Sequence, residues 1–176
     1  VLVGSSSDNV LTTGTIEGWI KTSNAGGAYS GIIVKQSAYS LFLYNNELIT
    51  YDWSGVGNIS TGRFLNDNAW HHVAMSFQSG VNAGTVIYLD GEAVLNTCYT
   101  VASTGAALAL GAGNDGGGQN FAGSIDEVRI WNVVRSASEI ASNRNVLVES
   151  NSPGLVSYFK LDETLAPLLT IQLRAV

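Results

Sequence analysis

The chain has 176 residues, which is enough for one domain, or one domain with a tail, and for a substantial core. Hydrophobic residues make up 45% of it and charged residues only 12%, so the composition excludes a disordered chain. A net charge of −6 with eight scattered lysines and arginines argues against a nucleic-acid-binding surface. No apolar run approaches the roughly 20 residues that cross a bilayer, so we expect no membrane insertion.

Cys98 is the only cysteine, so no intrachain disulfide can form. We expect it to be a small buried hydrophobic residue, with a reactive or intermolecular thiol as the alternative. The chain begins at Val1 without an initiator methionine or a signal peptide, which indicates a mature or excised fragment.

Short β-rich runs separated by turn residues fill the first half of the chain. Residues 1–3 are an apolar run suited to an edge strand. Residues 15–21 alternate, with Ile16, Gly18 and Ile20 on one face. Further β-rich runs lie at residues 31–35 and 39–44, followed by a hairpin turn at residues 45–47.

The second half continues the same pattern. Residues 52–62 read as a polar, glycine-rich loop, and residues 70–77 as the next strand. Residues 85–95 are the clearest hairpin, because Asp90-Gly91 supplies the positive φ angles of a type I′ turn. A strand at 106–110 leads into a second polar loop. About ten strands at this spacing indicate a sandwich or barrel and not alternating β and α units.

A glycine-rich loop at 117–120 leads into the most informative strand of the chain, residues 125–131. Ser136 follows it, with Glu139 three residues later. This spacing is a capping box, in which each side chain binds an unpaired backbone N–H at the start of a helix. We therefore expect a short helix at residues 137–143.

This region resembles the laminin G-like modules of the concanavalin A-like lectin/glucanase superfamily, in the bacterial and pentraxin-related branch. The resemblance rests on Phe121, Gly123, the run Ile-Asp-Glu-Val-Arg-Ile-Trp-Asn at 125–132 and the helix signal at 136–140. Three further blocks fit in order: 15–20, 70–74 and 88–91. The resemblance implies an all-β jelly-roll sandwich of two antiparallel sheets over residues 1–163. Residues 164–176 would be a tail, with an extra edge strand as one interpretation.

Catalysis by this chain is not expected. Glycosidases need two carboxylates facing each other across the scissile bond, and related enzymes use an acid-x-acid pattern on a strand. The acid-x-acid triplet of this chain, Asp90-Gly91-Glu92, lies at the predicted hairpin turn. Asp126 and Glu127 are adjacent, so we expect their side chains to leave opposite faces of the strand. His71 and His72 are neighbours on a strand, so they cannot both bind one metal from one face, and we interpret them as structural or surface residues.

Calcium is the more favoured cofactor, because polar loops can supply the six to eight oxygens that it prefers. In relatives one calcium joins an early loop to the Asp of the Ile-Asp-Glu-Val motif, so the resemblance assigns Asp126 to a structural site. The early-loop Asp of the family falls at Gly4 here, and Asp8 or backbone carbonyls would have to replace it. In the alternative interpretation Asp126 only caps loop N–H groups.

Two polar loops could bind a glycan, because a sugar needs an aromatic platform and hydrogen-bonding side chains. Trp53 is the aromatic residue expected to be exposed, with a packed loop anchor as its alternative. Trp19, Trp70 and Trp131 lie in strands and are expected to be packed. The candidate ligand-binding residues are Trp53, Asp52, Asn114, Asp115, Gln119 and Asn120.

The sequence therefore predicts a non-catalytic binding module, extracellular or at the cell surface, that recognises a glycan or glycoprotein and carries a structural calcium. One alternative is a protein-interaction or self-assembly module of an adhesin, sheath or filament, with other copies or neighbouring domains as partners. Another is an accessory carbohydrate-binding domain of a hydrolase outside this chain.

Overall fold

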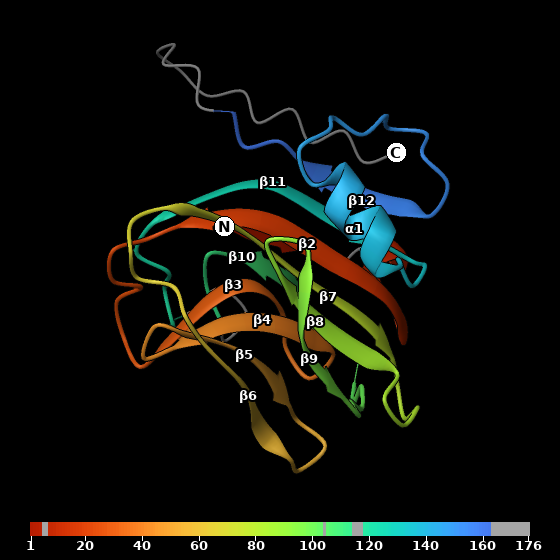
Figure 1. Ribbon diagram of the computed structural model, residues 1–176. Helices are drawn as coiled ribbons and strands as arrows, with labels where there is room; N and C mark the ends of the chain where they lie inside the picture. Colours follow the sequence, from red (N-terminus) through yellow and green to blue (C-terminus); the bar gives the residue numbers. More distant parts are fainter. Residues whose placement is uncertain (5–6, 104, 114–117, 163–176) are drawn as a thin grey trace.

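Turn-separated strands pair into two antiparallel sheets of six strands each (Figure 1). The computed structural model describes residues 1–4, 7–103, 105–113 and 118–162. Its elements are β1 Leu2–Gly4, a 3-10 turn Ser7–Asn9, β2 Thr13–Lys21, β3 Tyr29–Lys35, β4 Tyr39–Tyr44, β5 Glu47–Asp52, β6 Gly57–Phe64, β7 Trp70–Gln78, β8 Thr85–Leu89, β9 Glu92–Thr97, β10 Leu108–Leu110, β11 Ser124–Trp131, α1 Ala137–Asn143 and β12 Leu155–Phe159.

The sheets stack face to face around one main core. Sheet A has the strand order β1-β10-β3-β4-β5-β6, and sheet B has the order β12-β11-β2-β7-β8-β9. Alternating residues face inward, such as Ile16 and Ile20 of β2 and Leu41 and Leu43 of β4, and all four are buried. The predicted jelly-roll sandwich is confirmed.

Local turn chemistry sets the hairpins where the sequence predicts them. Asn45 and Asn46 both have positive φ and join β4 to β5, and Asp90 and Gly91 do the same between β8 and β9. Asparagine, aspartate and glycine tolerate this conformation, which matches the twist of the flanking strands. Each hairpin therefore fixes the register of its own strand pair.

The predicted helix and its cap are also confirmed. The Ser136 hydroxyl accepts the Glu139 N–H, and the Glu139 carboxylate accepts the Ser136 N–H. Ile140 is buried against Ala74 and Tyr88 on the outer face of sheet B. Helix α1 therefore covers part of the face of sheet B that lies away from the main core, as Figure 1 shows.

Three expectations, on residues 52–62, Cys98 and Trp70, are wrong. The polar stretch 52–62 is a loop only at its start, because β6 begins at Gly57. This strand is an edge strand whose polar and glycine residues show no apolar–polar alternation in the sequence, although its burial alternates over residues 57–61. Cys98 is exposed and not buried, because it follows the end of β9. Trp70 begins β7 at the rim of sheet B and is 43% exposed, although we expected it to be packed.

The predicted tail at 164–176 lies outside the described residues, so its suggested role as an edge strand stays a prediction, as does the domain boundary at 163. Within the described part of the chain, no helix has the length and apolarity needed to cross a membrane.

Candidate functional site

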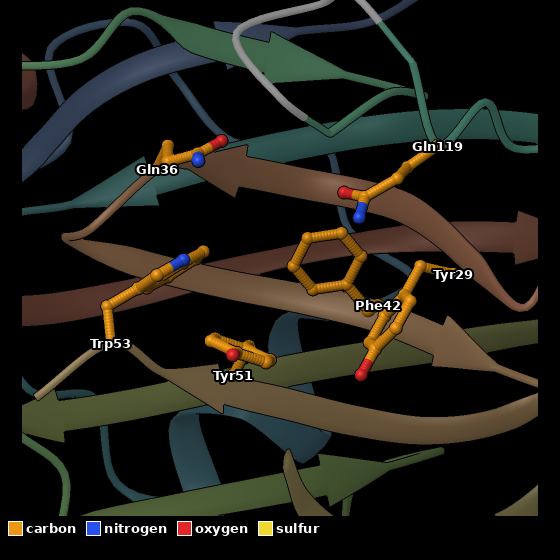
Figure 2. Close-up of a pocket in the computed structure, with 6 residues that line it drawn as sticks. All are labelled: Tyr29, Gln36, Phe42, Tyr51, Trp53 and Gln119. Carbon is orange, nitrogen blue, oxygen red and sulfur yellow. The ribbon is translucent and has the colours of Figure 1, made fainter. Parts of the chain in front are cut away.

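An aromatic cleft lies on the outer face of sheet A (Figure 2). Its volume is about 210 Å³, and the residues that line it come from β3, β4, the end of β5 and three adjoining loops. They are four aromatic and two amide side chains: Tyr29, Phe42, Tyr51, Trp53, Gln36 and Gln119.

The cleft exists because sheet A is apolar on both faces. Phe42 points away from the main core, between the inward Leu41 and Leu43, and packs with Val34 and Ile49 in a separate cluster. Tyrosine and tryptophan side chains cover this cluster but remain partly exposed. An apolar outer face on a sheet that already supplies a core leaves a surface suited to a ligand.

The aromatic rings form a continuous row. The Tyr29 ring lies 4.7 Å from Tyr44 and 6.3 Å from Tyr51, between ring centroids. Tyr51 lies 5.1 Å from Trp53, and Phe42 lies 6.5 Å from Trp53. These spacings are in the range of favourable aromatic pairs, so each ring supports the orientation of the next.

Polar groups border the aromatic floor. Figure 2 shows the Gln36 and Gln119 side chains along one side of the cleft, with Trp53 and Tyr29 towards its two ends. Neither glutamine side chain makes a hydrogen bond to any other described residue. The Tyr29 hydroxyl donates to Asn58 Oδ1 at 3.0 Å, which fixes that ring across the face of the sheet.

The structure brings together some of the predicted ligand residues. Trp53 and Gln119 both line the cleft, whereas Asn120 is exposed outside it. Asp52 is buried beneath the turn, where its carboxylate accepts the backbone N–H groups of Ser54 at 2.7 Å and Thr100 at 2.9 Å. It therefore supports the position of Trp53. Asn114 and Asp115 lie outside the described residues, and the ligand contacts of all six stay predictions.

Four cleft residues were missed from the sequence: Tyr29, Gln36, Phe42 and Tyr51. A signal for them exists in the run Tyr-Ser-Leu-Phe-Leu-Tyr at 39–44, where large apolar residues occupy both faces of one strand. In an antiparallel sheet such a run indicates burial on both faces, or a second apolar surface.

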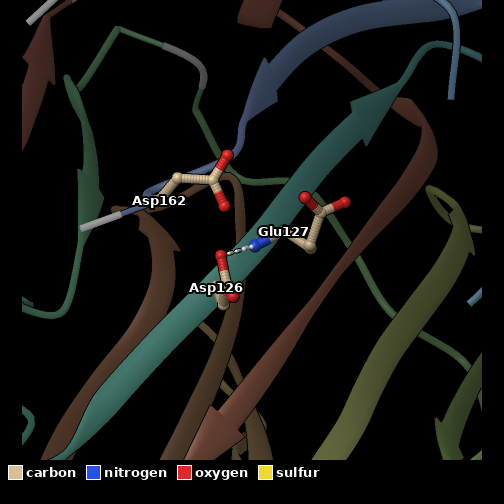
Figure 3. A group of neighbouring side chains, drawn as sticks. All are labelled: Asp126, Glu127 and Asp162. Atoms are coloured by element: carbon tan, nitrogen blue, oxygen red, sulfur yellow. Dashed lines mark hydrogen bonds between the residues drawn. The ribbon is translucent and has the colours of Figure 1, made fainter. Parts of the chain in front are cut away.

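An acidic cluster lies at an irregularity of β11 (Figure 3). The carboxylates of Asp126, Glu127 and Asp162 have oxygens within 4.8 Å of one another. The pairing of β11 with β2 shifts register between Asp126 and Arg129, and Glu127 has a φ of 51°. A β-bulge of this kind redirects a side chain, so the expectation that Asp126 and Glu127 leave opposite faces is wrong.

Cations and hydroxyls satisfy only part of this cluster. Arg129 donates to Glu127 Oε2 at 2.8 Å, and the Tyr158 hydroxyl donates to the same oxygen. The Glu127 backbone N–H donates to Asp126 Oδ1 at 2.8 Å. Burial, and then the neighbouring carboxylates of Glu127 and Asp162, raise the pKa of Asp126 although the hydrogen bond opposes this. A cation placed among the three carboxylates would relieve their repulsion.

The oxygen donors of the cluster fit calcium, which binds carboxylate oxygens at about 2.3–2.6 Å. Oxygens within 4.8 Å of one another can share one such ion. Of the two metal ligands predicted from the sequence, Asp126 belongs to the cluster and Asp8 does not; Asp8 lies in the 3-10 turn after β1. The sequence missed Glu127 and Asp162, because a bulge and a distant strand end bring them beside Asp126.

A second cleft of about 430 Å³, the sheet B cleft, adjoins the acidic cluster on the outer face of sheet B. The segment after α1 forms one wall, held by the Trp19 indole N–H, which donates to the Arg144 carbonyl at 2.9 Å. Arg129 also donates to the Val146 carbonyl at 2.9 Å. The residues that line the cleft are Trp19, Trp70, Asp126, Glu127, Arg129, Arg144, Asn145, Val146 and Leu147.

A buried ionic network lies beside this cleft and holds β2, β11 and α1 together. Glu17 is fully buried, and its Oε1 accepts the Trp131 indole N–H at 2.8 Å and an Arg135 N–H at 3.1 Å. Burial raises the pKa of Glu17, while Arg135 and Trp131 act in the opposite direction. Because each charge has a partner, we interpret this network as structural.

Comparison with known proteins defines the class. Residues 2–141 match the laminin G family model described as the concanavalin A-like lectin/glucanases superfamily. The chain therefore belongs to the laminin G-like family of this superfamily, as its sequence motifs predict.

The chain is also similar to parts of larger proteins. It is 31% identical over 134 residues to the sushi, von Willebrand factor type A, EGF and pentraxin domain-containing protein 1 of Rattus norvegicus. That match covers 69% of this chain and 4% of the rat protein. The chain thus spans only a small part of this relative.

Two solved structures share the fold. A provisionally assigned carbohydrate-binding protein from Bacteroides ovatus aligns with a TM-score of 0.71 and 22% identity, covering 86% of this chain and 46% of that one. The CBM40 domain of the Ruminococcus gnavus IT-sialidase, bound to α2,3-sialyllactose, aligns with a TM-score of 0.61 and 15% identity, covering 82% and 93%. At these identities the likeness concerns the fold alone.

Proposed function

We propose that this chain is a non-catalytic glycan-binding module and that the aromatic cleft is its binding site. The observation that carries the proposal is the row of partly exposed rings bordered by two amide groups that make no hydrogen bond to any other described residue. Sugar rings have apolar faces that stack on aromatic rings and hydroxyls that pair with amides. A concave site with an apolar floor and a few polar groups is the usual form of a ligand site.

The relatives support this proposal by what two of them bind or are assigned to bind. The Bacteroides protein is assigned as carbohydrate-binding, and the Ruminococcus domain holds a sialylated sugar. We extend glycan or glycoprotein recognition to this chain, and with it an extracellular or cell-surface location, where such glycans are displayed. An accessory role beside a hydrolase outside this chain is a compatible version of the same function.

A structural calcium at the acidic cluster is the second part of the proposal. Asp126, Glu127 and Asp162 would hold the ion, and it would neutralise carboxylates on a bulged strand. The cluster belongs to sheet B, whereas the aromatic cleft belongs to sheet A. We therefore propose that calcium stabilises the fold and does not contact the sugar.

A protein-interaction or assembly function is a second candidate, favoured by the apolar wall of the sheet B cleft. Trp70, Val146 and Leu147 are 43%, 52% and 69% exposed. Exposed large apolar residues that gather around one cleft are typical of interaction surfaces. Sedimentation at increasing concentration tests this candidate: reversible self-association that Leu147→Asp abolishes favours it, and a strictly monomeric protein contradicts self-assembly.

A glycan array tests the main proposal. We expect the wild-type protein to bind a restricted set of glycans, and Trp53→Ala to lose at least about tenfold in affinity, because one central aromatic contact often supplies 1–2 kcal/mol. Binding that is unchanged in Trp53→Ala would contradict the placement of the site. No binding to any glycan would contradict the function.

A further inference from the structure

The described residues that line the aromatic cleft carry no charge. Its six lining side chains are aromatic rings and amides. The nearest carboxylate in sequence, Asp52, is buried under the turn, and both of its oxygens accept backbone N–H groups. The polar groups that border the cleft are therefore neutral donors and acceptors, which match hydroxyl groups.

No lysine or arginine of the described residues lines the cleft. In sheet A, Lys35 is fully buried and its ammonium group donates to the Ala106 carbonyl, while Arg63 lies near the end of β6. The remaining described lysines and arginines lie on sheet B or in the segments that follow its strands: Lys21, Arg129, Arg135, Arg144 and Lys160.

An acidic sugar needs a cation, and the described lining of this cleft presents none. Proteins recognise carboxylate, sulfate and phosphate groups chiefly through arginine and lysine. Placing such a group against aromatic rings and amides would remove its water without providing a counter-charge, which is unfavourable. The CBM40 domain shows that this fold can hold a sialylated sugar. The fold therefore does not determine whether a glycan site takes neutral or acidic sugars. The residues that line the cleft determine this preference.

From this lining we infer that the cleft takes neutral glycans and discriminates against sialylated, uronate-containing and sulfated ones. This inference rests on the proposed glycan-binding function and adds the chemical class of the ligand. Neutral recognition through stacking and uncharged hydrogen bonds also depends little on ionic strength, because salt screens charge pairs and not these contacts.

The test is a glycan array of matched pairs, in which each neutral oligosaccharide stands beside its sialylated, uronate or sulfated counterpart. We expect the neutral member of every bound pair to bind at least about tenfold more tightly, equivalent to about 1.4 kcal/mol. Trp53→Ala should abolish the signal. If the acidic members bind as tightly or more tightly, and Trp53→Ala abolishes that binding, the inferred preference for neutral glycans is wrong. The proposed glycan-binding function is then still supported. No bound glycan at all overturns both.

A positive charge introduced at the edge of the aromatic cleft tests whether the lack of a cation causes the preference for neutral glycans. Gln36→Lys places an ammonium group beside the cleft, and Gln36→Asn is the matched neutral control. Gln36→Lys should raise the binding of acidic members relative to their neutral partners several-fold, and Gln36→Asn should leave that ratio unchanged. If the ratio of acidic to neutral binding is the same in Gln36→Lys as in the wild type, the lack of a cation is not the cause of the preference for neutral glycans.

Discussion

His72 is buried beside arginine side chains on the outer face of sheet B. Burial first, and then the positive charges of Arg129 and Arg144, lower the pKa of His72 to about 3. Its Nε2 lies 3.5 Å from Glu17 Oε2, an oxygen that accepts no hydrogen bond from the described residues. Burial and these positive charges therefore favour the neutral imidazole in the folded protein.

This residue makes stability depend on pH. The unfolded chain binds a proton at His72 near pH 6.5, whereas the folded chain binds it only near pH 3. The stability that His72 contributes is therefore complete above about pH 6.5 and is lost as the pH falls towards about 3. Between about pH 7 and pH 5 we expect the melting temperature to fall by roughly 5 °C through this group.

The His72→Gln variant isolates this effect, because an amide of similar size does not titrate. Its melting temperature should vary less between the two pH values than that of the wild type. His71 stays present in both proteins; although burial acts against it, Asp90 and Asp67 raise the pKa of His71 and favour stability at low pH. Identical pH profiles for the two proteins would show that His72 is not the cause.

Single residues could be predicted from the sequence only where the local context decides their position. Trp53 and Gln119 were assigned to a ligand surface because polar loop residues surround them, and both line the cleft. Phe42 and Tyr29 were missed, because their outward position depends on the faces of two paired strands. The packing of neighbouring strands determines which face of the sheet these side chains occupy, and a short stretch of sequence does not contain that information.

At the scale of elements, the bulge of β11 determines the metal proposal. We expect calcium to raise the melting temperature of the wild type by roughly 5 to 10 °C over chelator-treated protein, since a ligand at about 100 times its Kd adds about 2.7 kcal/mol. Asp126→Asn should melt at the chelated temperature with or without calcium. Asp8→Asn is the matched control and should keep the shift, because Asp8 is not part of the cluster.

Two results would contradict this assignment. A wild type that melts at the same temperature with calcium and with chelator excludes a structural calcium. A shift lost in Asp8→Asn but kept in Asp126→Asn places the ion at the early loop instead, with Asp126 as a cap for the Glu127 N–H.

A close contact between strand β3 and the loop that carries Gln119 also supports the aromatic cleft. The Gly31 N–H donates to the Gln119 carbonyl at 2.8 Å, and a Cβ on Gly31 would lie 2.4 Å from the Ala112 carbonyl group. Gly31→Ala should therefore push this loop away from β3. We expect a loss of about 1–3 kcal/mol in urea denaturation, as for other overpacked sites, together with weaker glycan binding. Unchanged stability would show that the loop adapts freely.

The sequence predicts best those helices and hairpins that are determined by residues close together in the chain. Helix α1 follows from its capping box, and the β4–β5 and β8–β9 hairpins follow from residues that favour positive φ. Strand β6 was missed because an edge strand needs no alternation. The bulge at Glu127 was missed because it depends on how β11 pairs with β2.

At the scale of the whole molecule, the sandwich separates two candidate surfaces. The aromatic cleft lies on the outer face of sheet A, and the sheet B cleft with its acidic cluster lies on the outer face of the other sheet. The main core lies between them. Sugar binding and any contact with a protein partner could therefore occur on the same domain without competing.

Each surface carries a tryptophan that is at least partly exposed, which allows a matched experiment. Trp53 lines the aromatic cleft, and Trp70 lines the sheet B cleft. Both residues can be replaced by alanine with a similar loss of apolar area.

The most direct measurement is the affinity of the best array glycan for the wild type, Trp53→Ala and Trp70→Ala, determined by titration calorimetry with calcium present. We expect Trp53→Ala to weaken binding at least about tenfold and Trp70→Ala to stay within about twofold of the wild type. The reverse result, with binding lost in Trp70→Ala and kept in Trp53→Ala, would place the sugar on sheet B and contradict the aromatic cleft as the binding site.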